Sequence, residues 1–276
     1  MINTWLGWFF MLLFSCGVWS CSSHPYNATN KIYKKKTAEF AKLLKAQPVV
    51  PTAADSIKEP PYWVGTTNFG MRKPNMVIIH HTAQNSCEQT LQTFTLERTE
   101  VSAHYVICKD GTLHHMLNDY LRAWHAGSAK WGNNSDLNSS SIGIEIDNNG
   151  VDSFSRAQIN SLLGLLSDLK KRYNIPSANF IGHGDIAPAR KNDPNVTFPW
   201  KILANQGYGL WYSDTSGVIV PSDTNDDMLL RIIGYDVKVR AASIQAFRRH
   251  FIGIDQPGDL TVPERKILYV LSAKYM

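Results

Sequence analysis

Charge is scarce in this sequence, and long basic tracts are missing from it. Only 18% of the 276 residues are charged, and the formal net charge is +5. This mild bias suits an anionic polymer or a phospholipid surface. It lacks the dense basic stripes of nucleic-acid-binding proteins, so we expect no nucleic-acid partner. The hydrophobic share of 43% is enough for a well-filled core and argues against disorder over most of the length.

The apolar run at the N-terminus is too short to cross a membrane. It reads WLGWFFMLLF (5–14) and has the size of the hydrophobic region of an export signal. A Cys after such a run, preceded by Ser and a little earlier by Val or Leu, resembles a bacterial lipobox. Cys16 and Cys21 both qualify. We favour Cys21 as the lipidated residue, because it gives a signal peptide (1–20) of more usual length. A plain cleaved signal peptide is the alternative, and either one takes the protein out of the cytoplasm.

Cysteine is equally scarce. Of four in the chain, Cys16 and Cys21 belong to the export segment, so only Cys87 and Cys108 remain in the folded part. An oxidising compartment permits a disulfide between them. Their spacing does not show that they are close, so the pairing stays open.

The chain organisation predicts four parts. After the signal peptide, residues 21–65 are polar and then rich in proline, which is typical of a tether with room for a short helix near 37–45. The cluster Lys34–Lys36 is most simply a solvated face of this linker, although it could also hold the linker near anionic lipid. The main domain follows at 66–211, and a polar linker introduces a small helical module at 212–276.

Hydrophobic periodicity in the main domain predicts an α/β (α+β) fold with a mixed central β-sheet flanked by helices. The Asp110-Gly111 pair indicates a hairpin between two of its strands. We expect strands at 76–81, 104–108, 112–116, 141–146 and 178–182, and helices at 86–99 and 155–173. The tail should add a three-helix module, with helices at 228–233, 242–251 and 262–275.

The sequence has no HExxH motif, so any metal site must draw its ligands from distant segments. His80 and His81 end a buried strand and point to opposite faces, so only one of them can enter a given pocket. His183 ends the last strand, and Asp185 and Asp193 lie in the loop that follows. Two strand-end histidines and one loop carboxylate can hold zinc and leave a fourth position for water, as hydrolytic sites require.

A carboxylate inside an apolar strand is the candidate acid or base. Glu145 faces opposite to its isoleucine neighbours in SIGIEI, and Asp147, two residues on, is its rival. In a pocket, such a group could deprotonate water and later protonate a leaving amine. Lys191 lies two residues before Asp193 and could stabilise an oxyanion, although a solvent-facing loop lysine is as good an interpretation.

Four segments together resemble the N-acetylmuramoyl-L-alanine amidase type 2 family. They are VIIHHTA (77–83), AWHAG (123–127), SIGIEI (141–146) and GHGDIAPARKNDP (182–194), in order and with suitable gaps. The family shares its fold with peptidoglycan-recognition proteins and with phage amidases of the T7 lysozyme type. The lipobox, the last of the four segments and the helical tail look most like the AmiD-type lipoprotein amidases of the outer membrane.

The resemblance implies a role for each matching residue. His80, His183 and Asp193 would bind zinc, Glu145 would be the catalytic acid or base, and Lys191 would be the oxyanion partner. Three further residues lie in segments that line the cleft in the family and would contact substrate: Trp124, His125 and Arg190. Core packing is the alternative for Trp124, and for His104 we prefer a buried structural role.

Two departures from the family pattern are visible. The catalytic strand continues as IEIDNNG, with Asp147 where the family usually has Glu, and the loop at 192–199 lacks a common glycine. Neither change removes a ligand, whereas inactive peptidoglycan-recognition relatives typically lose one. The expected function is therefore zinc-dependent cleavage between the muramic acid lactyl group and the first L-alanine of the peptidoglycan stem peptide.

Three other functions compete with this one. A non-catalytic peptidoglycan-binding lipoprotein of the same fold would not need the full ligand set. A structural tether between wall and membrane would not need Glu145 or Lys191. A cytoplasmic recycling amidase for anhydro-muropeptides conflicts with the export signal.

The sequence also suggests a role for the C-terminal helices and a cellular location. The segments IIGYDV (232–237) and IQAFRRHF (244–251) resemble a peptidoglycan-binding module, with a purely stabilising helical cap as the alternative. Ser22 and Ser23 after the lipobox favour an outer-membrane lipoprotein facing the periplasm, and a soluble periplasmic protein is the alternative. We expect a monomer whose partners are peptidoglycan or muropeptides and, through the lipid anchor, the membrane.

Overall fold

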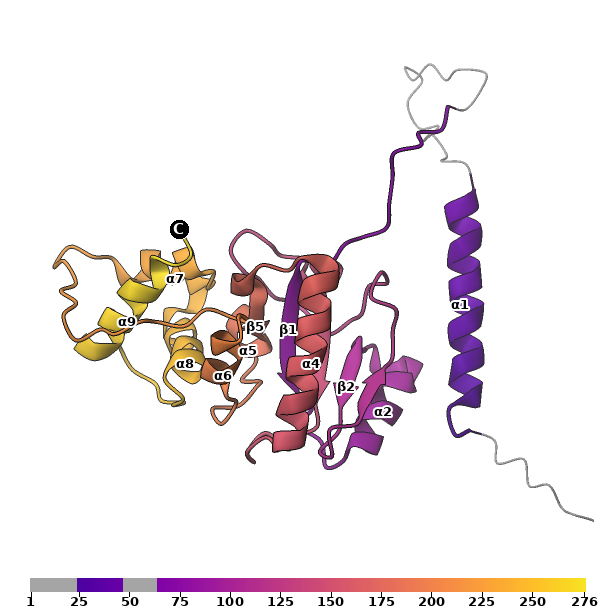
Figure 1. Ribbon diagram of the computed structural model, residues 1–276, viewed down its shortest axis with the longest axis horizontal. Coiled ribbons are helices and arrows are strands. Elements are labelled where there is room, and N and C mark those ends of the chain that lie inside the picture. The colour runs from indigo at the N-terminus through magenta and orange to yellow at the C-terminus, as the bar shows by residue number, and fades with distance from the viewer. Residues whose placement is uncertain (1–23, 47–63) are drawn as a thin grey trace, which may run out of the picture. The chain divides into compact units, whose positions relative to one another are not determined.

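The computed structural model describes residues 24–46 and 64–276, and it divides the chain into two compact units, 1–67 and 68–276 (Figure 1). The predicted signal peptide and its Cys16 and Cys21 lie outside the described residues. In the part of the chain that is described, no helix is long and apolar enough to cross a membrane.

The described part of the first unit contains one long helix, α1 (Asn27–Lys45). It begins ten residues before the short helix that the sequence predicts, because lysine and alanine in its first half are strong helix formers even without a core to face. None of its residues is buried.

The second unit is built on a mixed five-stranded sheet in the order β3-β2-β4-β1-β5. β1 (Met76–His81) pairs in parallel with β4 (Ser141–Ile146) on one side and β5 (Phe180–Gly182) on the other. β2 (Tyr105–Ile107) is parallel to β4, and β3 (Leu113–His115) returns antiparallel to β2 after the Asp-Gly turn. The predicted fold class is confirmed.

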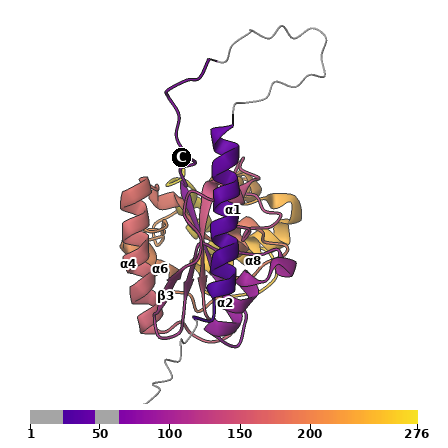
Figure 2. The ribbon, with the colours of Figure 1, turned by 90° about the vertical axis from the view of Figure 1, so that its right-hand side faces the viewer.

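Helices cover both faces of this sheet (Figure 2). On one face, α4 (Arg156–Tyr173) buries its leucines against alternate residues of β1 and β4, such as Val77 and Ile144. On the other face, Met76 and Ile78 share a second core with α7 (Asp226–Ile233), α8 (Arg240–Phe251) and α9 (Val262–Ser272). The tail helices therefore pack on the sheet through a continuous apolar core.

The remaining helices are short and connect these layers. They are α2 (Cys87–Thr95), α3 (Leu137–Ser140), α5 (His183–Ile186), α6 (Trp200–Asn205) and the 3-10 turns η1 (Glu97–Thr99), η2 (Ser177–Asn179) and η3 (Val237–Val239). Ser86 caps α2 and Ser155 caps α4 through a capping box. α2 ends earlier than the predicted helix at 86–99, and Leu96, the residue that follows it, is 43% exposed.

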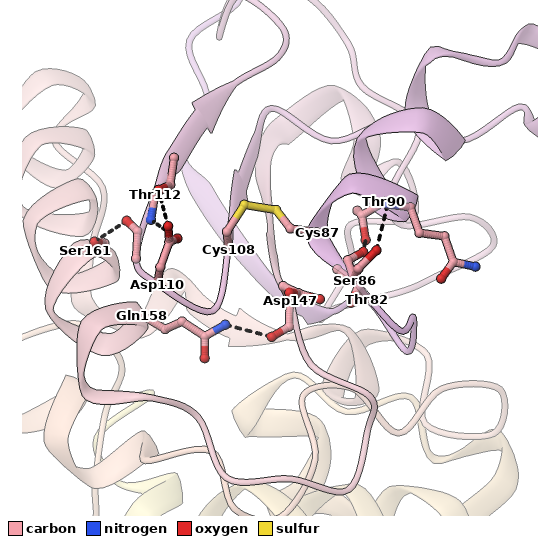
Figure 3. Close-up of a disulfide and its surroundings, with 12 residues drawn as sticks. Thr82, Ser86, Cys87, Thr90, Cys108, Asp110, Thr112, Asp147, Gln158 and Ser161 are labelled. Atoms are coloured by element: carbon pink, nitrogen blue, oxygen red, sulfur yellow. Dashed lines mark hydrogen bonds between the residues drawn. A yellow bond between two sulfur atoms is a disulfide. The ribbon is translucent and has the colours of Figure 1, made fainter. Parts of the chain in front are cut away.

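A disulfide joins Cys87 at the start of α2 to Cys108 after β2, so the pairing that the sequence left open is formed (Figure 3). It closes 21 residues of chain, for which chain entropy predicts a stabilisation of about 3 kcal/mol. Asp147, the rival of Glu145 in the sequence, lies beside this bridge. Burial raises the pKa of Asp147, and the charge of Lys109, followed by the backbone N–H groups of Cys87 and Lys109, opposes that shift.

Candidate metal centre and active site

Strand register brings the candidate residues to one edge of the sheet. His80 of β1 is paired with Glu145 of β4, so both side chains point to the same face. Gly182 of β5 is paired with Ile79, which places the next residue, His183, beside His80. Asp193 returns to this edge in the loop after α5, where its backbone oxygen accepts a hydrogen bond from Gly184.

Three buried side chains converge there in a nearly equilateral triangle. The Nδ1 atoms of His80 and His183 are 3.0 Å apart, and each lies 3.1 Å from Oδ2 of Asp193. The three residues are between 1% and 6% exposed. Their closest ligand atoms form one of two clusters in the described residues that have metal-binding geometry. The other includes the two disulfide-bonded cysteines and has no free thiolates to offer.

The hydrogen bonds behind His80 fix which of its nitrogens carries the proton. The carbonyl of Leu137 can only accept, so Ser141 donates its hydroxyl proton there and accepts from Nε2 of His125 at 3.1 Å. Nδ1 of His125 then accepts from Nε2 of His80 at 3.0 Å. Burial first, then neighbouring histidines, keep both rings neutral, with the pKa of His80 lowered to about 4 and that of His125 well below its ordinary value. His80 therefore presents a lone pair at Nδ1.

His183 is oriented in the same way. Its Nε2 lies 3.1 Å from the carbonyl oxygen of Ala126, which can only accept, so the proton is at Nε2 and the lone pair is at Nδ1. Arg190 donates to the same carbonyl and to that of Ser128, at 2.8 Å each. The segment that orients His183 is thus held in place from the loop that carries Asp193.

This donor set fits a zinc ion. Two imidazole lone pairs and a carboxylate oxygen face one another without a proton between them, which is repulsive unless a cation lies at the centre. Tetrahedral zinc with bonds of about 2.0–2.1 Å separates its ligand atoms by about 3.3 Å, close to the separations in the triangle. His80, His183 and Asp193 would therefore hold the metal, with one position left for water or substrate.

Gly143 of β4 has no side chain, and this leaves room for the ring of His125, which supports His80. A Cβ on Gly143 would lie 2.4 Å from the ring of His125, so only glycine allows that ring to pack flat on the strand. His125, expected to contact substrate, is 8% exposed and has both ring nitrogens engaged inside the protein. The structure places it behind His80.

Glu145 lies next to these three side chains, with Oε1 at 3.9 Å from Nδ1 of His80. Its Oε2 is buried and has no hydrogen-bond partner among the residues that the structure describes. Burial, followed by the negative charge of Asp193, raises the pKa of Glu145 to about 8, and the charge of Lys191 opposes this. Lys191 also lowers the pKa of His80, so its ammonium group acts on both residues.

His81 and Asp185, the alternative metal ligands from the sequence, are hydrogen-bonded to other groups. His81 points to the opposite side, where Nδ1 accepts from the backbone N–H of Asn195 at 3.1 Å. Asp185 accepts from Tyr235 and from His250, at 2.7 Å each, and from the backbone of Gly182 at 2.8 Å. The sequence alternatives of His81 and Asp185 as ligands are thereby excluded by geometry.

Two other expectations have clear outcomes. The side chain of Trp124 is 52% exposed, so core packing is wrong for it. His104 is fully buried and accepts from the backbone N–H of Gly143 at Nδ1, which confirms the structural role preferred for it.

Sequence reasoning missed the supporting residues. Ser141 and Gly143 belong to the SIGIEI strand, on the same face as Glu145. Small residues at alternate positions of that face could have indicated that another side chain packs against the strand there. Tyr235 and His250 gave no sequence signal, because their partner Asp185 lies far away in the chain.

Comparison with known proteins identifies the family. The family model described as N-acetylmuramoyl-L-alanine amidase matches residues 70–196. N-acetylmuramoyl-L-alanine amidase AmiD of Escherichia coli K12 is 33% identical over 231 residues, which cover 72% of this chain and 83% of AmiD.

Solved structures agree with this match. The complex of Escherichia coli AmiD with anhydro-N-acetylmuramic acid-L-Ala-D-gamma-Glu-L-Lys has a TM-score of 0.67 and 29% identity, covering 79% of this chain and 97% of that one. AmpDh3 from Pseudomonas aeruginosa in complex with an anhydromuramic pentapeptide has a TM-score of 0.66 and 30% identity, covering 80% and 99%. The chain therefore belongs to the N-acetylmuramoyl-L-alanine amidase family.

Proposed function

We propose that this protein is a zinc-dependent N-acetylmuramoyl-L-alanine amidase that hydrolyses the amide between the muramic acid lactyl group and L-alanine. The buried triangle of His80, His183 and Asp193 beside Glu145 is the observation that carries this proposal. A non-catalytic binder of the same fold would have no use for a raised carboxylate pKa at this place.

Each residue of the site has a defined task. A zinc ion, when bound, would polarise the scissile carbonyl and make water more acidic. Glu145 accepts a proton from the attacking water and delivers it to the leaving nitrogen of L-alanine, a task that suits a carboxylate with a pKa of about 8. Lys191 stabilises the negative charge that develops on the carbonyl oxygen.

The supporting residues act through the ligands. We assign His125 to the orientation of His80 instead of to substrate contact, because both of its ring nitrogens are already bonded. Arg190 holds the Ala126 carbonyl that orients His183. Trp124, with its exposed indole next to this segment, is the remaining candidate to contact the sugar or the stem peptide.

Muropeptides are the proposed substrates. The solved AmiD and AmpDh3 complexes contain anhydromuramic peptides, and the chain aligns with nearly their whole length.

We further propose that the protein is attached to the cell envelope through a lipid on Cys21 and faces the periplasm. The formed Cys87–Cys108 disulfide supports an oxidising compartment. Residues 212–276 would then be a helical part that supports the catalytic domain and contacts peptidoglycan.

The test is a product analysis with purified protein. Peptidoglycan fragments are incubated with the zinc-loaded protein, and mass spectrometry detects free stem peptides that begin with L-alanine. Release that stops with a zinc chelator and returns with zinc supports the proposal. Substrate binding without release at full zinc occupancy would exclude catalysis and favour the non-catalytic lipoprotein.

A further inference from the structure

The positive charge of this protein is concentrated in one helix. α1 contains six lysines and one glutamate, a net charge of +5, which equals the formal charge of the whole chain. Residues 64–276 contain 21 lysines and arginines against 20 aspartates and glutamates. The catalytic unit is therefore almost neutral, and the amidase proposal gives this charge no task.

The same helix has an exposed apolar face. Its large apolar residues fall within an arc of about 120° at 3.6 residues per turn: Ile32, Tyr33, Phe40, Leu43 and Leu44, with exposed fractions from 37% to 78%. Five lysines occupy the opposite side in an arc of about 100°: Lys31, Lys34, Lys35, Lys42 and Lys45. The sixth, Lys36, lies within the apolar arc, where a long aliphatic stem can extend toward the polar side.

A helix with a basic face and an apolar face favours one kind of binding partner over the others. A second copy of the helix would bring another charge of +5 against the first, which opposes self-association. An anionic polymer would satisfy the lysines and leave the apolar arc in water. An anionic lipid surface satisfies both, because the apolar face enters the boundary between headgroups and acyl chains while lysines stay near the phosphates.

We infer that α1 is an amphipathic helix that binds the surface of an anionic lipid membrane, independently of any lipid on Cys21. This inference rests on the proposed envelope location and not on the amidase chemistry. The affinity of such a helix comes from the apolar area that it buries in the lipid and from the attraction of its basic residues to anionic headgroups. The helix would thus hold the neutral catalytic unit at the membrane through its own contacts.

Vesicle binding tests the inference without substrate or zinc. The chain from residue 21 onward, with Cys21→Ser to prevent lipidation, is sedimented with vesicles that contain phosphatidylglycerol or only phosphatidylcholine. We expect binding to the anionic vesicles alone, weakened by high salt. Each lysine removed should weaken it about fivefold, so a triple variant should bind about a hundredfold more weakly. That variant is Lys34→Gln/Lys35→Gln/Lys42→Gln.

The matched control removes three exposed lysines from the second unit, Lys171→Gln/Lys201→Gln/Lys238→Gln. It changes the net charge equally and should bind vesicles like the unaltered protein. An equal loss in both triple variants would overturn the inference, since it would reflect net charge alone.

The apolar arc has its own variant, Phe40→Ala/Leu44→Ala, in which alanine preserves helix propensity. It should bind anionic vesicles at least about tenfold more weakly. Unchanged binding would instead make α1 a polyanion-binding surface, and a stable dimer of the lipid-free protein by sedimentation would make it a self-association helix. Hydrolysis of soluble muropeptides should be the same in every variant, so failure of the amidase proposal is detected separately.

Discussion

Glu145 has a buried oxygen without a hydrogen-bond partner among the residues that the structure describes, and its other oxygen lies 3.9 Å from Nδ1 of His80. Replacing Glu145 by Gln keeps the shape of the side chain and removes its capacity to carry a proton. We expect the rate of muropeptide hydrolysis to fall by about 10²–10⁴-fold while bound zinc stays at one per chain. Steady-state kinetics and metal analysis measure the two quantities. If zinc is lost together with activity, Glu145 has a structural task and the proposed proton transfer is wrong.

His125 should influence the metal without touching it. His125→Phe retains an aromatic ring over Gly143 and removes the acceptor for the Nε2 proton of His80. Because outer partners of a metal-binding histidine typically contribute 10–100-fold to affinity, we expect zinc binding to weaken by about that factor. Competition with a chelator measures it, and the absorption spectrum of the cobalt-substituted protein should shift.

The variant Ser141→Ala should have a smaller effect on zinc affinity than His125→Phe, and comparing the two tests the prediction. It interrupts the same chain of hydrogen bonds one step further from the metal, so its effect should be in the same direction and smaller. Zinc affinity equal to that of the unaltered protein in both variants would show that His125 only fills space.

At this scale the sequence predicted which residues meet, and it did not predict their orientation. His80, His183, Asp193 and Glu145 come together as expected, because strand register alone brings three of them to one edge. The position of His125 depends on a missing Cβ at Gly143, on a strand that follows it in the chain. Such a dependence between two separate segments has no periodicity that a single sequence could reveal.

Among single elements, α9 carries a buried ion pair that links it to α8. Glu264 accepts two hydrogen bonds from Arg248, at 2.8 and 2.9 Å, and one from the backbone N–H of Thr261 at 2.7 Å. The bonds from Arg248 are the main reason that the pKa of Glu264 falls from 4.5 to about 2. A lowered pKa means that the ionised form stabilises the fold above pH 4.5 and that this contribution is lost as the pH falls toward 2.

Glu264→Gln tests this pH dependence. At pH 7 the variant should be less stable by about 3 kcal/mol, the value of a pKa shift of this size, and by more if Arg248 is left uncompensated. The difference from the unaltered protein should shrink as the pH is lowered from 4.5 toward 2, because Glu264 is then protonated in both states of the unaltered chain. Urea unfolding at several pH values measures the difference. A difference that does not depend on pH would assign the effect to packing.

Element boundaries show where periodicity was and was not informative. α4 matches its prediction within one residue, because leucines recur on one face and Ser155 caps its start. α1 was underestimated, since its lysine-rich first half has no core to face and resembles a solvated linker. α2 ends before Leu96 because the chain turns into η1 there, and no glycine or proline marks the change.

For the whole second unit, the decisive feature is that the tail helices share a core with the sheet. Ile78 of β1 is buried in the same cluster as Phe247 of α8 and Leu268 of α9. Asp185, two residues after His183, is bonded to Tyr235 and His250 from the tail. A tail that was only a wall-binding appendage would have no reason to be hydrogen-bonded so close to His183.

His250→Phe separates the hydrogen bond from the packing. The ring of His250 stacks on Trp200, with centroids 3.9 Å apart, and phenylalanine can keep this contact while losing the bond to Asp185. Because that bond joins a charged carboxylate inside the protein, we expect a loss of about 1.5–3 kcal/mol in unfolding free energy. Zinc affinity should fall as well, since α5 begins with His183.

Removing residues 212–276 is the stronger form of the same test. It would expose Met76 and Ile78 to water and leave Asp185 without its two side-chain partners. We expect the shortened chain to lose cooperative unfolding and zinc binding together, whereas the full second unit unfolds in a single calorimetric transition. A shortened chain that stays folded, with unchanged zinc affinity, would instead show that the tail is an independent module. Its contacts with α5 would then not be needed to hold His183 in place.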